Sequence, residues 1–348
     1  MIGLMSGTSL DGLDICNLSF EWHNGNWSLD IHHAETIAYP KELEVQLREA
    51  FHWSNEKVHQ LDLLYSSYLS DQVLSFIEKH QITRLDAVSS HGHTIWHEPQ
   101  RQFTKQIGNL SLVAAKTNLN WIVDFRVADI ALGGQGAPLV PIGDELLFGD
   151  FDYCLNLGGF ANISFSDLGS RLAYDICAVN VVLNRLAQTL NLNFDLDGLK
   201  ARSGRCDSEL LLRLNQLDFY NQNYPKSLGM EWVEASVWPL LKSSSLSSVD
   251  KLATYINHIA YQIGNAFGKK NKKILVSGGG AKNTFLVESI SKFTDNELFI
   301  PDLQIIDFKE AIVFAFLGVL RLRNEVNCLK SVTGASENHC SGNIFFKP

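Results

Sequence analysis

A strand–turn–strand pattern that occurs twice constrains the fold of this chain more than any other feature. The apolar residues 2–5 are followed by a turn rich in Gly, Ser, Thr and Asp at 6–12, and an alternating segment resumes at 13–20. Residues 153–165 repeat the pattern, with a Gly-Gly pair as the interruption. Apolar runs bounded by such residues are typical of β-hairpins. The repetition predicts two related α/β lobes, each opening with a hairpin.

Length and charge agree with this organisation and exclude several classes of protein. A chain of 348 residues has room for roughly two domains of about 150 residues. Apolar residues make up 45% and charged residues 19%, which is the balance of a packed globular protein. The net charge of −9 argues against nucleic acid or an anionic membrane as the partner. A phosphate ligand would therefore need local backbone N–H groups or a metal ion.

The sequence favours a cytoplasmic location. Its longest apolar run, near residues 311–320, is shorter than the about 20 residues of a membrane span. The start lacks the basic and apolar regions of a secretory signal. The six cysteines are scattered without a C-x-x-C pair, which predicts reduced, buried thiols.

The first turn, SGTSLDG, has the residues of a phosphate-binding loop. Gly7 and Gly12 allow a tight turn whose N–H groups approach a ligand, and Thr8 and Ser9 can donate to phosphate oxygens. Asp11 would repel a phosphate, so we expect it to hold Mg²⁺ through water. An ordinary hairpin turn favours the same residue types and is the alternative.

Two further glycine segments suggest nucleotide contacts. The second turn, LNLGGFANIS, could form another phosphate cradle or simply a tight hairpin. The segment VSGGGAKNT follows a predicted strand and precedes a predicted helix, and its glycines would let an adenine or ribose lie against the backbone. It matches neither the Walker A pattern nor the G-x-G-x-x-G dinucleotide pattern.

Two groups of side chains could carry chemistry. Asp175 is expected at the end of an apolar strand, where it can accept a proton or merely cap the following helix. His91, His93 and His97 have a spacing that could supply three imidazoles to zinc. Because no C-x-x-C or H-E-x-x-H accompanies them, a polar segment lining a pocket is the favoured interpretation.

These motifs, in this order, resemble the anhydro-N-acetylmuramic acid kinase family, within the class of sugar kinases, actin and heat-shock ATPases. The resemblance covers nearly the whole chain and rests on GLMSGTSLDGLD, SHGHT, QIGN, DFR, GGQGAPLVP, NLGGFANIS, GGGAKN, KEAIVFAFLG and VTGA. It implies an α/β fold of two actin-like, ribonuclease H-like lobes with an interlobe nucleotide cleft. We expect the lobes at residues 1–135 and 136–307, and leave open whether the final helix, about 308–348, returns to the first lobe.

The resemblance also assigns roles to individual residues. Asp175 matches the catalytic base. Mg²⁺ and ATP are the implied cofactors, with Asp11 holding Mg²⁺ through water and ATP contacts at Gly7, Thr8, Ser9, Leu10, Asp11, Gly12, Leu13, Asp14, Gly158, Gly159, Asn162, Gly278, Gly279, Gly280, Asn283 and Glu310. The amino sugar substrate is expected at His91, His93, Thr94, Arg126, Asp129, Gln135, Gly136 and Ala137.

The implied reaction opens the ring of 1,6-anhydro-N-acetylmuramic acid with water and phosphorylates O6, in cell-wall murein recycling. The chain departs from the family in two places. Where the family reads D-T-G-P-G-N, this chain has DICAVN, which keeps only Asp175 and Asn180 and should change the loop shape beside the base. His93 stands where the family usually has Gln.

A chaperone-like or regulatory ATPase of the same fold is the second interpretation, because fold alone does not set function. A zinc hydrolase is a third. The resemblance further suggests a homodimer, and neither nucleic acid nor membrane is an expected partner.

Overall fold

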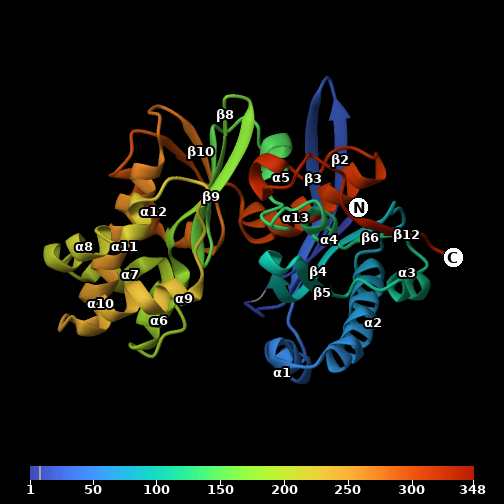
Figure 1. Ribbon diagram of the computed structural model, residues 1–348, viewed down its shortest axis with the longest axis horizontal. Coiled ribbons are helices and arrows are strands. Elements are labelled where there is room, and N and C mark those ends of the chain that lie inside the picture. The colour runs from blue at the N-terminus through green and yellow to red at the C-terminus, as the bar shows by residue number, and fades with distance from the viewer. Residues whose placement is uncertain (8) are drawn as a thin grey trace. The chain divides into compact units, whose positions relative to one another are not determined.

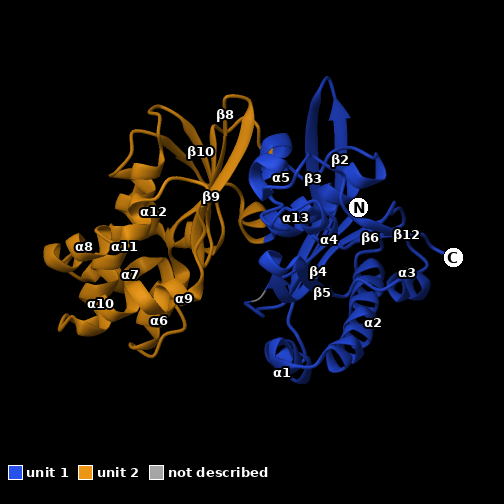
Figure 2. Ribbon diagram, in the orientation of Figure 1, with its two compact units in different colours: residues 1–147, 308–348 blue, residues 148–307 orange. Residues whose placement is uncertain are grey.

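The computed structural model describes residues 1–7 and 9–348, and its chain divides into two compact units. Unit 1 comprises residues 1–147 and 308–348, and unit 2 comprises residues 148–307 (Figure 2). Each unit contains a mixed β-sheet and its own hydrophobic core, so the predicted α/β class is confirmed. Within the described residues, no helix has the length and apolar character needed to cross a membrane.

The sheet of unit 1 has the strand order β12-β6-β4-β1-β2-β3, with β5 paired to β4 (Figure 1). β1 runs antiparallel to β2 and parallel to β4, and β4 runs parallel to β6. The strands of this sheet are β1 (Ile2–Ser6), β2 (Leu13–His23), β3 (Asn26–Ile37), β4 (Val88–Glu98), β5 (Phe103–Ile107), β6 (Trp121–Val123) and β12 (Asn343–Phe345).

Helices pack on both faces of this sheet because β1 is apolar on both sides. Ile2 and Leu4 belong to the core that contains α2, and Gly3 faces α13 on the other side. Ser54 caps α2 by accepting the N–H of Lys57. The helices of unit 1 are α1 (Lys41–Glu49), α2 (Asn55–Lys79), α3 (Leu112–Thr117), α4 (Val127–Ala131), α5 (Pro141–Leu147), α14 (Lys330–Thr333) and most of α13 (Leu303–Leu322), with 3-10 turns η1 (Ala50–His52) and η2 (Pro99–Arg101).

The sheet of unit 2 has the order β11-β10-β7-β8-β9. The strand β7 runs antiparallel to β8 and parallel to β10, and β10 runs parallel to β11. The strands are β7 (Tyr153–Leu157), β8 (Phe160–Asp167), β9 (Ser170–Ala178), β10 (Lys273–Ser277) and β11 (Glu297–Phe299).

The core of unit 2 lies between this sheet and several helices, among which α11 contributes many of the buried side chains. Tyr255 of α11 donates its hydroxyl proton to Ala178 O of β9. Ser247 and Asn283 cap α11 and α12. The helices are α6 (Asn180–Gln188), α7 (Leu199–Ser203), α8 (Ser208–Asn215), α9 (Met230–Trp232), α10 (Trp238–Ser243), α11 (Ser248–Ala266) and α12 (Thr284–Ser291), with short turns η3 (Leu196–Gly198), η4 (Asp218–Asn221), η5 (Val233–Val237, π) and η6 (Gly279–Lys282).

The two sheets share one topology. In each, the second and third strands follow the first strand of the opening hairpin antiparallel on one side, and two strands parallel to it lie on the other; unit 1 adds β5 and β12 to this common set of five. This order corresponds strand by strand, β1 with β7 and β4 with β10. The repeat predicted from the two hairpins is therefore present at the level of topology.

Replacing Gly3 by Ala tests the contact between β1 and α13. An added Cβ would lie 2.2 Å from Ala311 O and 2.8 Å from Ala315 Cβ. Because neither the helix backbone nor the strand can yield easily, we expect Gly3→Ala to lower the free energy of unfolding by about 1–3 kcal/mol. Urea denaturation followed by circular dichroism measures this change.

Gly268→Ala is the matched control, because a Cβ there meets nothing within 4 Å. Equal unfolding midpoints for the two variants would contradict the close approach of β1 and α13.

Candidate active site

The first glycine turn joins two strands in the middle of the unit 1 sheet. Backbone N–H of Leu10 donates to Gly7 O, and Ser9 Oγ donates to Asp11 Oδ1 at 2.8 Å. Leu10 and Gly12 have positive φ angles of 60° and 155°. At Gly12 a Cβ would lie 2.8 Å from Ile37 O, so this position requires glycine.

The side chains of this turn differ in what they can offer a ligand. Asp11 is exposed, whereas Leu13 is buried in the core and has only its backbone groups left for a ligand. Asp14 accepts a hydrogen bond from Thr36. Thr8, a predicted phosphate contact, lies outside the described residues.

A chain of hydroxyl groups fixes the tautomer of His93. Ser6, the last residue of β1, stands in register with His93 of β4. Tyr39 donates to Ser6 Oγ at 2.6 Å, and Ser6 Oγ lies 2.8 Å from His93 Nδ1. The Ser6 proton itself needs an acceptor, and among the described side chains His93 Nδ1 is the one within hydrogen-bond distance that can accept it, so the imidazole proton stays on Nε2. Burial lowers the pKa of His93 to about 4, so His93 is a neutral N–H donor at neutral pH.

A second network joins four of the predicted substrate residues. Arg126 donates from Nε and Nη2 to His91 Nε2 at 3.0 and 2.8 Å, and from Nη1 to Gly136 O at 3.2 Å. Gly136 N donates to Asp129 Oδ2 at 2.6 Å. Burial and the charge of Arg126 hold the pKa of His91 well below its usual value, so His91 is neutral and accepts from Arg126.

The other predicted residues of unit 1 lie around this network. Gln135 N donates to Thr333 O, which ties the loop before Ala137 to α14. Thr94 of β4 receives a hydrogen bond from Gln106 of β5. Glu310 lies on α13, where desolvation raises the pKa of its carboxylate and the charges of Arg126 and Lys309 oppose that rise.

In unit 2, the hairpin turn and the glycine segment after β10 are in contact. A Cβ on Gly278 would lie 2.4 Å from Asn156 Oδ1, and one on Gly280 would lie 2.7 Å from Leu157 Cβ. Gly278 also has a positive φ of 80°. These close approaches require glycine, and they place the predicted phosphate turn beside the predicted adenosine segment. Gly279 is exposed between them.

A row of polar residues crosses the unit 2 sheet. Asn156 of β7 pairs with Asn162 of β8, and Asn162 pairs with Asp175 of β9. Paired residues on neighbouring strands project from the same face of a sheet, so these three side chains share a face. All three are only partly buried. Asp175 is therefore grouped with Asn162 and with the turn at Gly158 and Gly159.

The geometry around Asp175 suits a proton acceptor. Asp175 lies within β9, which continues to Ala178, so its expected place at the end of the strand is wrong. The helix α6 begins five residues later, at Asn180, so the alternative that Asp175 caps this helix is wrong as well. Leu228 N donates to Asp175 Oδ2 at 2.8 Å. Desolvation raises the pKa of Asp175, and the bond from Leu228 opposes part of that rise.

The DICAVN segment does not form the altered loop that its sequence suggested. Ile176, Cys177 and Ala178 continue β9 and are buried in the core of unit 2. Asn180 Nδ2 donates to Leu157 O at 3.1 Å, and its backbone N–H donates to Gly158 O. Of the two polar residues that this chain keeps, Asp175 thus lies on β9, and Asn180 lies against the glycine turn.

The remaining predictions have plainer outcomes. Asn283 Oδ1 accepts Leu286 N and caps α12, which leaves only its amide nitrogen for a nucleotide.

Within the described part of the chain, the cluster with metal-ligand spacing is Asp129, Cys328 and His339, so the three-histidine zinc site is not formed. Sequence reasoning missed Ser6, Tyr39 and Leu228, whose roles come from contacts between distant segments without a motif.

Comparison with known proteins identifies the family. The family model for anhydro-N-acetylmuramic acid kinase matches residues 1–347. The chain belongs to this family. The kinase of that name from Sulfurovum sp. (strain NBC37-1) is 34% identical over 366 residues, covering 99% of this chain and 98% of that protein. The one from Haemophilus influenzae is 32% identical, covering 99% and 97%.

Family membership confirms the predicted resemblance and the assignment as a kinase, in preference to a chaperone-like ATPase. Component A of (R)-2-hydroxyglutaryl-CoA dehydratase from Acidaminococcus fermentans covers 90% of this chain at 12% identity and a TM-score of 0.46. The matched region makes up 94% of component A. The family assignment does not depend on this distant likeness.

Replacing His93 by Gln tests the neutral imidazole in the hydroxyl chain. Its folded pKa of about 4 lies below the ordinary 6.5, so between these values only the unfolded chain binds the proton. Stability is therefore fully present above pH 6.5 and falls as the pH drops toward 4, by up to about 1.4 kcal/mol per pH unit for this group. Gln does not titrate, and we expect His93→Gln to flatten this slope. Urea unfolding midpoints at several pH values measure it.

His23→Gln, at an exposed position, serves as the control and should keep the wild-type slope. Identical slopes for His93→Gln and the wild type would contradict the assignment of His93 as a buried neutral donor.

Proposed function

We propose that this chain uses ATP and Mg²⁺ to convert 1,6-anhydro-N-acetylmuramic acid to N-acetylmuramic acid 6-phosphate, with Asp175 as the base. The observation that carries the assignment of the base is the placement of Asp175. It is a carboxylate of raised pKa, partly exposed, paired in register with Asn162 and grouped with the glycine turn. Cytoplasmic murein recycling is the proposed setting.

The proposed reaction joins a ring opening to a phosphoryl transfer. Asp175 takes a proton from water, whose oxygen attacks the anomeric carbon as the bond from that carbon to O6 breaks. O6 then attacks the γ-phosphorus of ATP, and ADP leaves. A positioned base contributes about 10²–10⁴-fold to such a step. The raised pKa makes the carboxylate a stronger base than a free aspartate.

Each unit, taken by itself, has candidate contacts for ATP. In unit 2, the N–H groups of Gly158 and Gly159 and the segment Gly278–Gly280 are proposed to hold ATP, with Asn162 beside the base. In unit 1, the turn carrying Gly7 and Ser9 is proposed to bind phosphate. Such preorganised donors stabilise the charge that spreads over the transferring group.

The substrate is proposed to bind to the networks of unit 1. His93 offers a fixed Nε2–H donor for a sugar oxygen. Arg126 supplies positive charge beside the Gly136 loop, and burial lowers its pKa only to about 10, so it remains charged at neutral pH. A guanidinium is suited to bind a carboxylate such as the lactyl group of the substrate.

The donor set of the first turn fits a magnesium ion. Asp11 has an exposed carboxylate, and Mg²⁺ prefers carboxylate oxygens while keeping several waters. Asp11 would hold the ion through water, with Glu310 as a further carboxylate of the same unit. When bound, the ion would neutralise charge on the phosphates.

Replacing Asp175 by Asn tests the base. The amide keeps the shape and an acceptor oxygen for Leu228 N but cannot take the proton. We expect a fall in kcat of at least about 10²-fold with little change in the affinity for ATP. A coupled assay for ADP release in the presence of the anhydro-sugar gives the rate, and calorimetry gives the affinity.

Asp218→Asn, at an exposed position of the same unit, should keep the wild-type rate. A rate for Asp175→Asn within threefold of the wild type would exclude Asp175 as the base.

Replacing Asp11 by Asn tests the metal assignment. An amide holds the water shell of Mg²⁺ more weakly than a carboxylate does, so the concentration of Mg²⁺ for half-maximal activity should rise about tenfold. Titration of Mg²⁺ at fixed ATP measures the shift. Ser9→Ala removes the hydrogen bond to Asp11 but keeps its charge, and should shift the midpoint less. An unchanged midpoint in Asp11→Asn would remove Asp11 from the ion's surroundings.

A further inference from the structure

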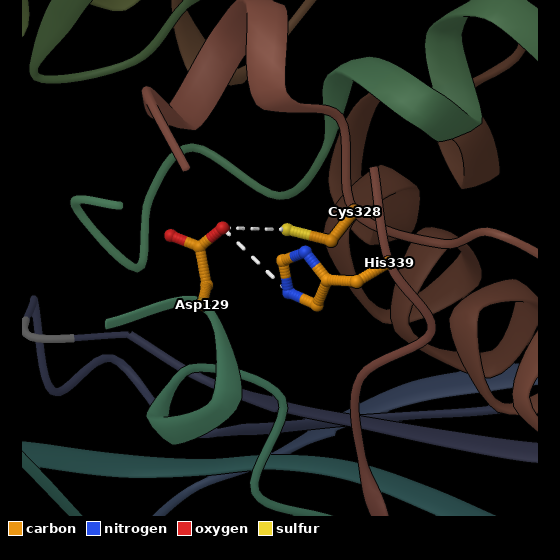
Figure 3. Close-up of side chains that lie close together, drawn as sticks. All are labelled: Asp129, Cys328 and His339. Atoms are coloured by element: carbon orange, nitrogen blue, oxygen red, sulfur yellow. Dashed lines mark hydrogen bonds and ion pairs between the residues drawn. The ribbon is translucent and has the colours of Figure 1, made fainter. Parts of the chain in front are cut away.

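Three potential metal ligands from two segments of unit 1 meet at one point. Asp129 lies on α4, whereas Cys328 and His339 come from the C-terminal segment (Figure 3). Asp129 and Cys328 are buried, and His339 is 9% exposed. One side-chain atom of each lies within 4.8 Å of the others. Asp129 also belongs to the network around Arg126, whereas Cys328 and His339 have no part in the proposed reaction, and the sequence gives no motif for the group.

The distances are close to those of a metal site. Cys328 Sγ lies 3.1 Å from Asp129 Oδ1, and His339 Nε2 lies 3.7 Å from the same oxygen. Zinc binds oxygen and nitrogen at about 2.0–2.2 Å and thiolate sulfur at about 2.3 Å, so tetrahedral ligand atoms lie roughly 3.3–3.7 Å apart. The two separations from Asp129 Oδ1 are within a few tenths of an ångström of this range, and all three ligand atoms lie within 4.8 Å of one another.

The orientation of His339 is an independent sign of a cation. His339 Nδ1 lies 3.2 Å from Glu337 O and can only donate to it, because that carbonyl has no proton. In the neutral ring, Nε2 then carries a lone pair that faces the carboxylate oxygen of Asp129. Among the described residues, Nε2 is buried and has no hydrogen-bond partner. Two facing lone pairs repel each other unless a metal ion lies between them or Nε2 carries a proton.

The backbone holds two of the ligands ready. Cys328 and His339 form an isolated antiparallel bridge in which each N–H donates to the other's carbonyl at 3.1 Å. Directly opposed residues in such a pair project to the same side. The bond from His339 Nδ1 to a backbone carbonyl also fixes the ring as metal-binding histidines are usually fixed.

We propose that Asp129, Cys328 and His339 bind one divalent d-block metal ion, zinc in the first instance, with water as the fourth ligand. Binding breaks the S–H bond of Cys328, releases its proton to solvent and forms a metal–thiolate bond. The carboxylate and the thiolate together balance the 2+ charge, so the buried group becomes neutral. No oxidation state changes.

The position of this site defines its role. The other oxygen of Asp129 accepts Gly136 N, and Thr333 Oγ1 donates to Oδ1 at 2.7 Å. The ion would therefore clamp the C-terminal segment to α4 and to the loop at Gly136. With ligands this buried, the ion acts as a structural clamp.

Cobalt provides a direct test on the full chain. The purified protein is stripped with a chelator and titrated with Co²⁺. A thiolate ligand gives a charge-transfer absorption in the near ultraviolet that rises to one equivalent, and Zn²⁺ then abolishes it. We expect this band in the wild type and its absence in Cys328→Ser. In His339→Gln we expect an affinity at least about tenfold lower.

Cys340→Ser is the matched control, since it removes the neighbouring cysteine outside the cluster and should keep the band. Circular dichroism confirms that each variant is folded. If a substituted chain fails to fold, the wild-type titration decides alone. Absence of a charge-transfer band in the wild type would overturn the proposal, because His339 would then be a protonated partner of Asp129. Loss of the band in Cys340→Ser but not in Cys328→Ser would overturn it as well.

Discussion

The candidate functional residues of each unit depend on the same constraint: the first strand of the opening hairpin lies inside the sheet, between two neighbouring strands. β1 and β7 have hydrogen-bonded neighbours on both sides, which fix the register of each strand in its sheet. The strand that leads into each turn is therefore held between two neighbouring strands. A glycine turn fixed in this way can present N–H groups to a phosphate without first losing conformational entropy.

The same constraint explains where the polar side chains lie. In unit 1, the neighbour of β1 is β4, and the register places His93 next to Ser6, directly before the first turn. In unit 2, the neighbour of β7 is β8, and the register carries a polar row from Asn156 to Asp175. The shared topology thus produces two different chemistries, a neutral donor in one unit and a basic carboxylate in the other.

Much of the fold could be predicted from local patterns. The helical spacing over residues 55–79 matches α2, and the two hairpins revealed the repeat, because strand alternation and turn glycines act over short distances. The placement of Asp175 at a strand end was wrong, since the apolar residues that follow it continue β9 into the core. Contacts between segments far apart were beyond reach. The bond from Leu228 to Asp175 spans 53 residues, and that from Cys328 to Asp129 spans 199.

The departure at DICAVN shows why a motif and its geometry must be separated. The residues that differ from the family, 176–179, are buried, and their side chains pack in the core of unit 2. The hydrogen bonds that join this segment to the turn come largely from the backbone, where Val179 N–H donates to Gly159 O and Asn180 N–H donates to Gly158 O. Backbone donors do not depend on side-chain identity. The segment that follows Asp175 therefore keeps its hydrogen bonds to the glycine turn although the residues between Asp175 and Asn180 differ from those of the family. Asn180 adds the one side-chain bond of this set, to Leu157 O, and it is one of the two residues that the chain retains.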